Sequence, residues 1–480
     1  MSSVLDDDRL FGVGEVSEVG SSRVPAGAAK TFRRYDPAQS LLMPPSLDDW
    51  LPDDHTARFV AETVDELLDL TAVYVSYVEA SGAPPFDPKM MLKLLLYGYS
   101  TGVTSSREME RRCHVDVAFR WLSANTTPDY RSLARFRRRH LGALDALFVQ
   151  VLALCAGAGL VKLGRVALDG TKLRASASRH KAMSYDRLGS RIGVLEAEVA
   201  AILAEAEATD RAEDEMFGED HRGDEVPREL ARRETRLAKM RAAKEAIESD
   251  ARDKASEQAA ERARRGGQAD AQAERATPEK KAQRNFTDPD ARMMKTNDGF
   301  HYAYNAQAVV DEHRQVVLVA ALTQCANDVN QLFTMVEATE ANLAAADIDD
   351  DPDVVLADAG YCSETNLQTA ADRQINVLVA TGRLKHNERV ADVPRGPIPK
   401  DATQRERMAR RLRTKKGRAD YARRKAIVEP AFGQMKVRQH AGFLRLRGLS
   451  GAQGEWTLHT LCHNLRKLAN ARQAATLAAA

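Results

Sequence analysis

The chain has 480 residues and a formal net charge of only +1, because 70 Lys and Arg balance 69 Asp and Glu. Hydrophobic residues make up 44% of the chain and charged residues 29%, which fits a globular protein and excludes collagen-like or wholly disordered chains. The length predicts two to four domains, at roughly 150 residues for each.

No segment has the composition of a membrane span or a signal peptide. The longest apolar stretch, residues 146–161, is shorter than the roughly 20 residues that cross a bilayer. Asp6, Asp7 and Asp8 stand where a signal peptide carries positive charge. The five cysteines form no C-x-x-C pair, so neither a disulfide framework nor a zinc ribbon is indicated. We therefore expect a cytoplasmic protein with no membrane partner.

The first third of the chain predicts a tail followed by helices. Residues 1–34 show no sustained hydrophobic period, which predicts a disordered tail. Residues 35–160 have apolar residues at helical spacing, with start signals at Asp87-Pro88, at Ser105 with Glu108 as a capping box, and at Asp129. We predict an all-α N-terminal domain that binds DNA.

The last short helix of that domain, residues 131–140, carries five arginines. A row of short helices that ends in such a helix is typical of a helix-turn-helix-like DNA-binding module, in which Arg135 and Arg138 would contact DNA. A simply solvated arginine face is an equally good interpretation of this stretch taken alone.

The remainder predicts an α/β domain. A β-type run at 165–171 is followed much later by 301–310 and 315–322, with a turn at 311–313, and by 353–357 and 375–380, each preceded by a helical stretch. This order predicts a mixed sheet flanked by helices, built from residues 161–183 and 293–468, with a tail at 469–480.

Residues 184–292 interrupt this domain. Ile192, Leu195 and Val199 step by three and four, and Leu237 and Met240 resume the spacing, which predicts an inserted helical hairpin. Residues 251–276 are almost all Ala, Glu, Arg and Gln, which indicates a solvated helix or a disordered linker.

Three acidic residues stand out by their context. Asp169 and Asp358 each follow an apolar β-type run, and ligands of α/β sheets bind beyond the carboxyl ends of strands. Glu429 follows Ile427-Val428 in a basic segment. Three such oxygen donors suit Mg²⁺ or Mn²⁺, and a pair of these ions can drive phosphodiester displacement. Taken singly, each aspartate is more simply a turn or cap residue, and Glu429 an ordinary ion-pairing residue.

The surrounding charge favours the functional interpretation. Residues 405–447 contain 15 Lys and Arg against three acids, a local net charge of +12, which favours a polyanionic partner. Lys436 lies two helical turns after Glu429, and Lys425 lies one turn before it, so all three share a helix face. Pro430 indicates that the helix begins at Glu429 or is kinked there.

These features together resemble the DDE transposases of bacterial insertion sequences. The resemblance rests on the runs ending in Asp169 and Asp358, on the D-x-G-Y of 358–361, and on Tyr421 to Lys425 followed by Glu429 and Lys436. Residues 88–93 and 120–122 are similar to the group with an InsH-type N-terminal domain, within the IS-four and IS-five-like superfamily.

The resemblance implies an RNase H-like catalytic domain in which Asp169, Asp358 and Glu429 are catalytic and hold Mg²⁺ or Mn²⁺. It also implies a Y-R-E-K signature that binds the element's end. Besides Glu429, the signature residues are Tyr421, either Arg424 or Lys425, and Lys436.

The implied activity is metal-dependent cleavage at the ends of an insertion sequence, followed by 3′-OH strand transfer into target DNA. The implied partners are double-stranded DNA, at element ends and target, and further copies of the chain in a homodimer or higher synaptic complex at the bacterial nucleoid. Two alternatives stay open: a metal-dependent nuclease that does not join, and an inactive DNA-binding derivative.

Overall fold

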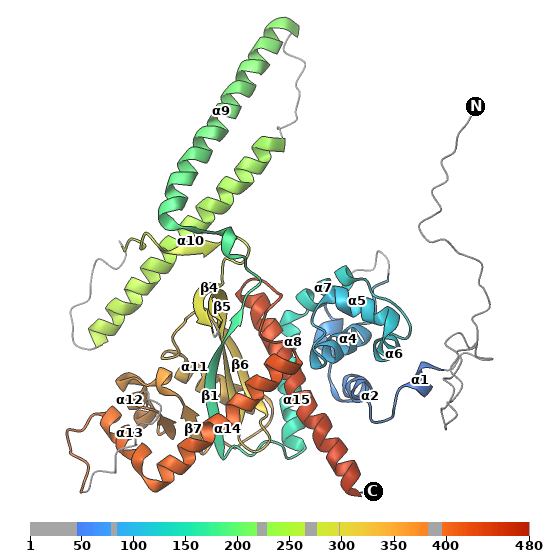
Figure 1. Ribbon diagram of the computed structural model, residues 1–480, viewed down its shortest axis with the longest axis vertical. Coiled ribbons are helices and arrows are strands. Elements are labelled where there is room, and N and C mark those ends of the chain that lie inside the picture. Colours follow the sequence, from blue (N-terminus) through green and yellow to red (C-terminus); the bar gives the residue numbers. More distant parts are fainter. Residues whose placement is uncertain are drawn as a thin grey trace, which may run out of the picture. The chain divides into compact units, whose positions relative to one another are not determined.

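The computed structural model describes residues 46–77, 84–217, 228–264, 276–296, 298–382 and 396–479. Contacts group residues 47–480 as one compact unit, whose elements are traced in Figure 1. The tail predicted over residues 1–34 lies outside the described residues. The division of the compact unit into two domains and an insertion stays a prediction.

The first part of this unit is helical, as predicted. Asp87 and Asp129 act as N-caps, since the Asp87 carboxylate accepts from the Lys89 amide at 2.7 Å and the Asp129 carboxylate from the Arg131 amide at 2.9 Å. The elements are α1 (Leu47–Trp50), α2 (Thr56–Glu62), the π-helical η1 (Thr63–Leu67), α3 (Thr71–Tyr74), α4 (Pro88–Ser100), α5 (Ser106–Val115), α6 (Val117–Leu122), α7 (Tyr130–Arg139) and α8 (Leu141–Gly157).

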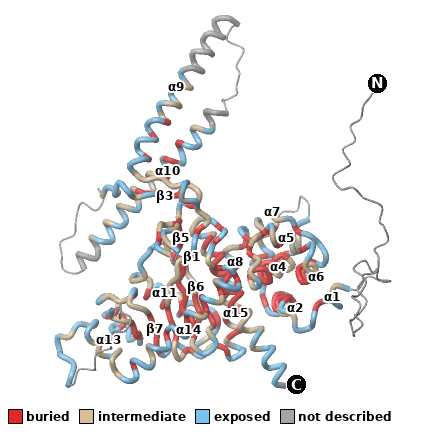
Figure 2. Tube along the Cα trace, in the orientation of Figure 1, coloured by how far each residue is buried: buried red, intermediate tan, exposed pale blue. Residues whose placement is uncertain are grey.

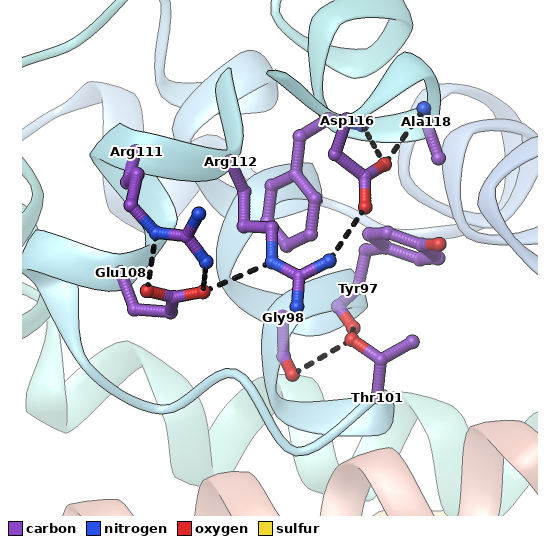
Figure 3. Close-up of polar contacts among 9 residues, drawn as sticks. Tyr97, Gly98, Thr101, Glu108, Arg111, Arg112, Asp116 and Ala118 are labelled. Carbon is purple, nitrogen blue, oxygen red and sulfur yellow. Dashed lines mark hydrogen bonds and ion pairs between the residues drawn. The ribbon is translucent and has the colours of Figure 1, made fainter. Parts of the chain in front are cut away.

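The capping box predicted at Ser105 is wrong, although α5 begins there. The Ser105 side chain makes no capping hydrogen bond. The Glu108 carboxylate instead accepts from Arg111 and Arg112, and Arg112 also donates to Asp116 at 3.0 Å (Figure 3). These charge-assisted bonds lower the pKa of Glu108 to about 2. Two guanidinium groups one turn away therefore compete successfully with the backbone for this carboxylate.

A mixed sheet forms the centre of the second part, which confirms the predicted fold class. Its main strands run in the order β6-β5-β1-β7-β8, and β4 pairs with β5. β5 is antiparallel to β1 and β6, whereas β7 is parallel to β1 and β8. The strands are β1 (Arg165–Arg174), β4 (Arg292–Thr296), β5 (Gly299–Asp311), β6 (Val317–Thr323), β7 (Val354–Ala357) and β8 (Val377–Val379).

Helices accompany the sheet as an RNase H-like fold requires. They are α11 (Gln331–Ala345), α12 (Glu364–Asp372), α13 (Gln404–Arg413), α14 (Lys415–Arg438) and α15 (Leu449–Ala479). Buried residues follow the strands, α8 and α15 (Figure 2), and Trp456 of α15 is fully buried. Residues 469–479, which we predicted as a tail, continue α15. Strand β4 escaped prediction because its five residues lack an alternating pattern.

Helix α14 corrects the prediction of a helix start at Glu429. It runs unbroken from Lys415 to Arg438 with Pro430 inside it. Proline has no amide hydrogen to donate to the carbonyl of Ala426, four residues earlier. The side-chain amide of Gln315, in the turn between β5 and β6, donates to that carbonyl at 3.0 Å instead. A contact from a distant loop therefore satisfies the group that Pro430 leaves free.

The segment between β1 and β4 contains the predicted helical hairpin. Helix α9 (Tyr185–Phe217) lies beside α10 (Arg228–Arg264), and the short strands β2 (Ala182–Ser184) and β3 (Gln283–Asn285) pair at its base. Ile192 and Leu195 pack with Leu237 and Met240 in a small core of their own. Residues 251–264 prolong α10, and those whose burial is described, 251–259, are mostly exposed; 265–275 lie outside the described residues.

Among the described helices, none is by itself long and apolar enough to cross a membrane. Only α7 and α8 taken together, with a 72° bend between them, reach the required length and composition.

Candidate active site

Asp169 and Asp358 lie on neighbouring parallel strands. Leu168 of β1 pairs with Ala357 of β7, so the two aspartates follow at the same level of the sheet. Asp358 follows the last residue of β7 and accepts from the Gly360 amide at 2.8 Å, capping the one-turn 3-10 helix η4 (Ala359–Tyr361). Asp169 does not end its strand, because β1 continues to Arg174 through its pairing with β5.

The environment of Asp169 raises the pKa of its carboxyl group. Burial raises the pKa of Asp169, and the negative charge of Asp358 raises it further, while the Arg424 guanidinium acts in the opposite direction. The net pKa of Asp169 lies above the usual value of 3.8. Two carboxylates placed this closely favour a cation between them, which relieves their repulsion.

Helix α14 brings cations to β1. Its apolar stripe of Ile427, Val428, Ala431 and Met435 is buried against the fold. On this helix Arg424, only 9% exposed, forms an ion pair with Asp169 whose Nη1–Oδ2 distance is 2.9 Å. Lys436 donates from Nζ to the hydroxyl of Thr171, two residues after Asp169.

The structure separates the two cations that the sequence left as alternatives. Arg424 is buried on Asp169, whereas the adjacent Lys425 is exposed. Tyr421 lies one turn before Arg424 and is partly buried; burial raises the pKa of its hydroxyl, and the positive charge of Arg424 opposes that shift.

Glu429 is not brought to the two aspartates. It lies on α14 between Arg424 and Lys436, and its side chain is exposed. Over the described ranges of the chain, no three acidic, His or Cys side chains converge as a metal-binding group. The pair of Asp169 and Asp358 nevertheless fits a divalent cation by its chemistry, since both are hard oxygen donors and one already binds a guanidinium.

The arginines of α7 divide into two groups. Arg135 and Arg138, the predicted DNA contacts, are exposed. Arg137 is buried and donates from Nη1 to the Tyr99 hydroxyl at 2.6 Å and to the Thr104 carbonyl at 3.0 Å. Arg137 therefore stabilises the fold, whereas Arg135 and Arg138 lie on the exposed face of α7.

The sequence analysis missed a polar group behind the two aspartates. Asn305 and Gln307 of β5 are fully buried, and both donate to Asp328 in the loop before α11. Lys172 of β1 lies 3.6 Å from the same Asp328 oxygen. Two buried polar residues two positions apart in an otherwise apolar strand were the available signal, because they mark one face of that strand.

Two family comparisons match this chain. Residues 45–139, which cover α1 to α7, match the family described as a transposase domain (DUF772). Residues 263–465, which include Asp328, Asp358 and Glu429, match the family described as a transposase DDE domain. Comparison with curated proteins and with solved structures gives no match.

Proposed function

We propose that this chain, which belongs to the DDE transposases of the insertion-sequence type, cuts DNA at its element's ends and joins the freed 3′-OH ends to target DNA. The matched DDE domain supports transposase activity in general, and the cutting and joining steps are the proposal. The observation that carries it is the pair of Asp169 and Asp358 on adjacent parallel strands, next to cations of α14.

In this proposal Asp169, Asp358 and Glu429 hold Mg²⁺ or Mn²⁺. A divalent ion would supply positive charge to the scissile phosphate and make bound water a better nucleophile. Asp169 and Asp358 already lie at one level of the sheet. Glu429 lies on the same helix as Arg424 and Lys436, which contact β1. In this proposal its exposed side chain would turn toward the pair when the metal ion binds.

DNA contacts would come from two surfaces. Lys436 and Tyr421 flank Glu429 on α14, in the segment with a net charge of +12, and would bind the phosphates next to the cut. The exposed Arg135 and Arg138 of α7 would bind a more distant part of the element's end. Joining two ends requires at least two copies of the chain, so we propose a dimeric or larger complex on DNA.

An in vitro reaction tests the proposal. The purified chain is incubated with DNA carrying the flanking ends of its own gene, with Mg²⁺ or EDTA, and compared with the Asp358→Ala variant. We expect metal-dependent 3′-OH ends and joined products with the wild type, and neither with the variant, which should still bind DNA. Cutting without joining would instead identify a nuclease, and binding without cutting an inactive derivative.

A further inference from the structure

A network of buried polar side chains lies on the face of the sheet opposite Asp169. In the β1–β5 pairing Gly170 is opposite Gln307, and Lys172 is opposite Asn305. Residues that pair directly across strands point to the same face, and successive residues alternate. Lys172, Asn305 and Gln307 therefore share one face, and Asp169 and Thr171 the other, where α14 lies.

Asp328 is the acceptor at the centre of this network. One of its oxygens, Oδ1, accepts from Asn305 Nδ2 at 2.6 Å and from Gln307 Nε2 at 2.8 Å, and lies 3.6 Å from Lys172 Nζ. Gln307 is fully buried, so losing this acceptor would leave its Nε2 without the partner that orients it. Asn305 Nδ2 would keep its bond to the Cys325 carbonyl at 3.0 Å. Such a loss is costly in a protein interior.

The network continues to the turn that carries Asp358. The hydroxyl of the fully buried Tyr361 donates to Gln307 Oε1. Asn366 Nδ2 donates to the carbonyl of Tyr361 at 2.8 Å and to that of Val329, next to Asp328, at 2.6 Å. The turn 358–361 is thus tied at Tyr361 to both β5 and the Asp328 loop.

Two glycines leave the space that this arrangement needs. A Cβ atom at Gly170 would lie 2.4 Å from Gln307 Nε2, so any side chain there would displace the amide from Asp328. A Cβ at Gly360 would lie 3.0 Å from Asp358 Oδ1 and 3.4 Å from Asp328 Oδ2. Both carboxylates therefore lie close to the side of Gly360 where a Cβ would project, and a side chain at residue 360 would crowd them.

We propose that Asp328 is a positioning residue for Asp358. It holds Gln307, which holds Tyr361, and this chain sets the turn that aims the Asp358 carboxylate toward Asp169. Asp328 therefore acts on Asp358 through Gln307 and Tyr361. The inference rests on the proposed function in one respect, namely that Asp358 is a metal ligand.

The first test measures the turn directly, with no metal present. Amide hydrogen exchange is followed in the full chain for Asp328→Ala, Asp328→Asn and Asp349→Ala, the last being an exposed control after the other end of α11. We expect exchange across residues 358–362 to be about tenfold faster in Asp328→Ala, through local opening, and unchanged in the control. Asp328→Asn keeps the Oδ1 acceptor and should show a smaller increase. Unchanged exchange in Asp328→Ala would overturn the inference, and so would an equal increase throughout β5, which would show general destabilisation.

The second test measures Mn²⁺ affinity by the loss of the free-ion EPR signal, with Asp358→Asn as the reference for a disrupted site. Asp328→Ala should bind Mn²⁺ about tenfold more weakly than wild type, as is usual when an outer-shell partner is removed, and Asp328→Asn should recover part of the affinity. Wild-type affinity in Asp328→Ala would contradict the inference. A wild-type chain that binds no Mn²⁺ would refute the metal site of the proposed function, while the exchange measurement would still decide the role of Asp328.

Discussion

The charge state of Asp169 depends on two neighbours with opposite effects. Burial and Asp358 raise its pKa, and Arg424 lowers it through a direct ion pair. Arg424 and Lys425 are adjacent and chemically alike, yet only Arg424 lies on Asp169, while Lys425 is exposed. Two neighbouring positions on the helix therefore differ in effect: Arg424 changes the pKa of Asp169, whereas Lys425 contributes charge to the surface.

Replacing these two residues by methionine distinguishes their roles. Arg424→Met removes the charge that favours ionised Asp169, so the pKa of Asp169 rises further. Metal binding needs the ionised carboxylate, so the acid limb of Mn²⁺ binding should move to higher pH in Arg424→Met and stay in place in Lys425→Met. Titrations of Mn²⁺ affinity from neutral into acid pH check this, by comparing the pH at which each protein loses the ion. If wild type and Arg424→Met lose Mn²⁺ at the same pH, the ion pair with Arg424 does not control the pKa of Asp169.

Helix α14 depends on a contact that its own sequence does not contain. Pro430 removes one helical hydrogen bond, and Gln315 replaces it at the Ala426 carbonyl. Arg424, Glu429 and Lys436 therefore all lie on one unbroken helix. Had it begun at Glu429, as the proline indicated, Arg424 would lie outside it.

A double-mutant cycle tests this replacement. Gln315→Ala should lower the free energy of unfolding by about 1 kcal/mol in the wild type, because the Ala426 carbonyl loses its donor. The loss should be smaller in a Pro430→Ala background, where residue 430 has an amide hydrogen for that carbonyl. Urea unfolding of the four proteins gives the coupling. Additive effects would mean that the Gln315 side chain acts through its other contact, in which its Oε1 accepts from Lys467 Nζ at 3.1 Å.

At the scale of the whole molecule, the helical part and the sheet part share buried polar contacts, whereas the hairpin has its own core. Tyr99 of α4 donates to Glu455 of α15 at 2.9 Å, and both residues are fully buried. The hairpin core of α9 and α10, around Leu195 and Met240, is a separate cluster. Asp250 of α10 also forms an ion pair with Arg292 of β4 at 3.0 Å. Because the apolar cluster of the hairpin is separate, we expect the main core to fold without the hairpin.

Deleting the hairpin tests this separation. Residues 186–281 are replaced by Asn-Gly, which would close β2 and β3 as a tight two-residue hairpin, because Ser184 already pairs with Gln283. We expect the shortened chain to keep a cooperative thermal transition and the near-ultraviolet signal of its buried tryptophan. Loss of cooperative unfolding would show that the main core needs the hairpin. The same variant, used in the joining reaction, asks whether the hairpin serves assembly on DNA.

The sequence by itself determined what depends on neighbouring residues. Helical spacing and capping residues identified α4, α7 and the hairpin, and apolar runs identified β1, β5, β6, β7 and β8, because these patterns repeat within one element. Asp169 and Asp358 were predicted as a pair from the strands that precede them, and the structure places them side by side.

Only the tertiary structure decided which residues meet across the chain. Arg424 and Asp169 are 255 positions apart, and nothing local distinguishes Arg424 from Lys425. Asp328 carries no pattern of its own, and its place behind Asp358 follows from strand pairing and from two glycines that leave room. The exposed position of Glu429 likewise depends on how α14 packs on β1. Such contacts arise from the geometry of packed elements, which spacing along the sequence does not encode.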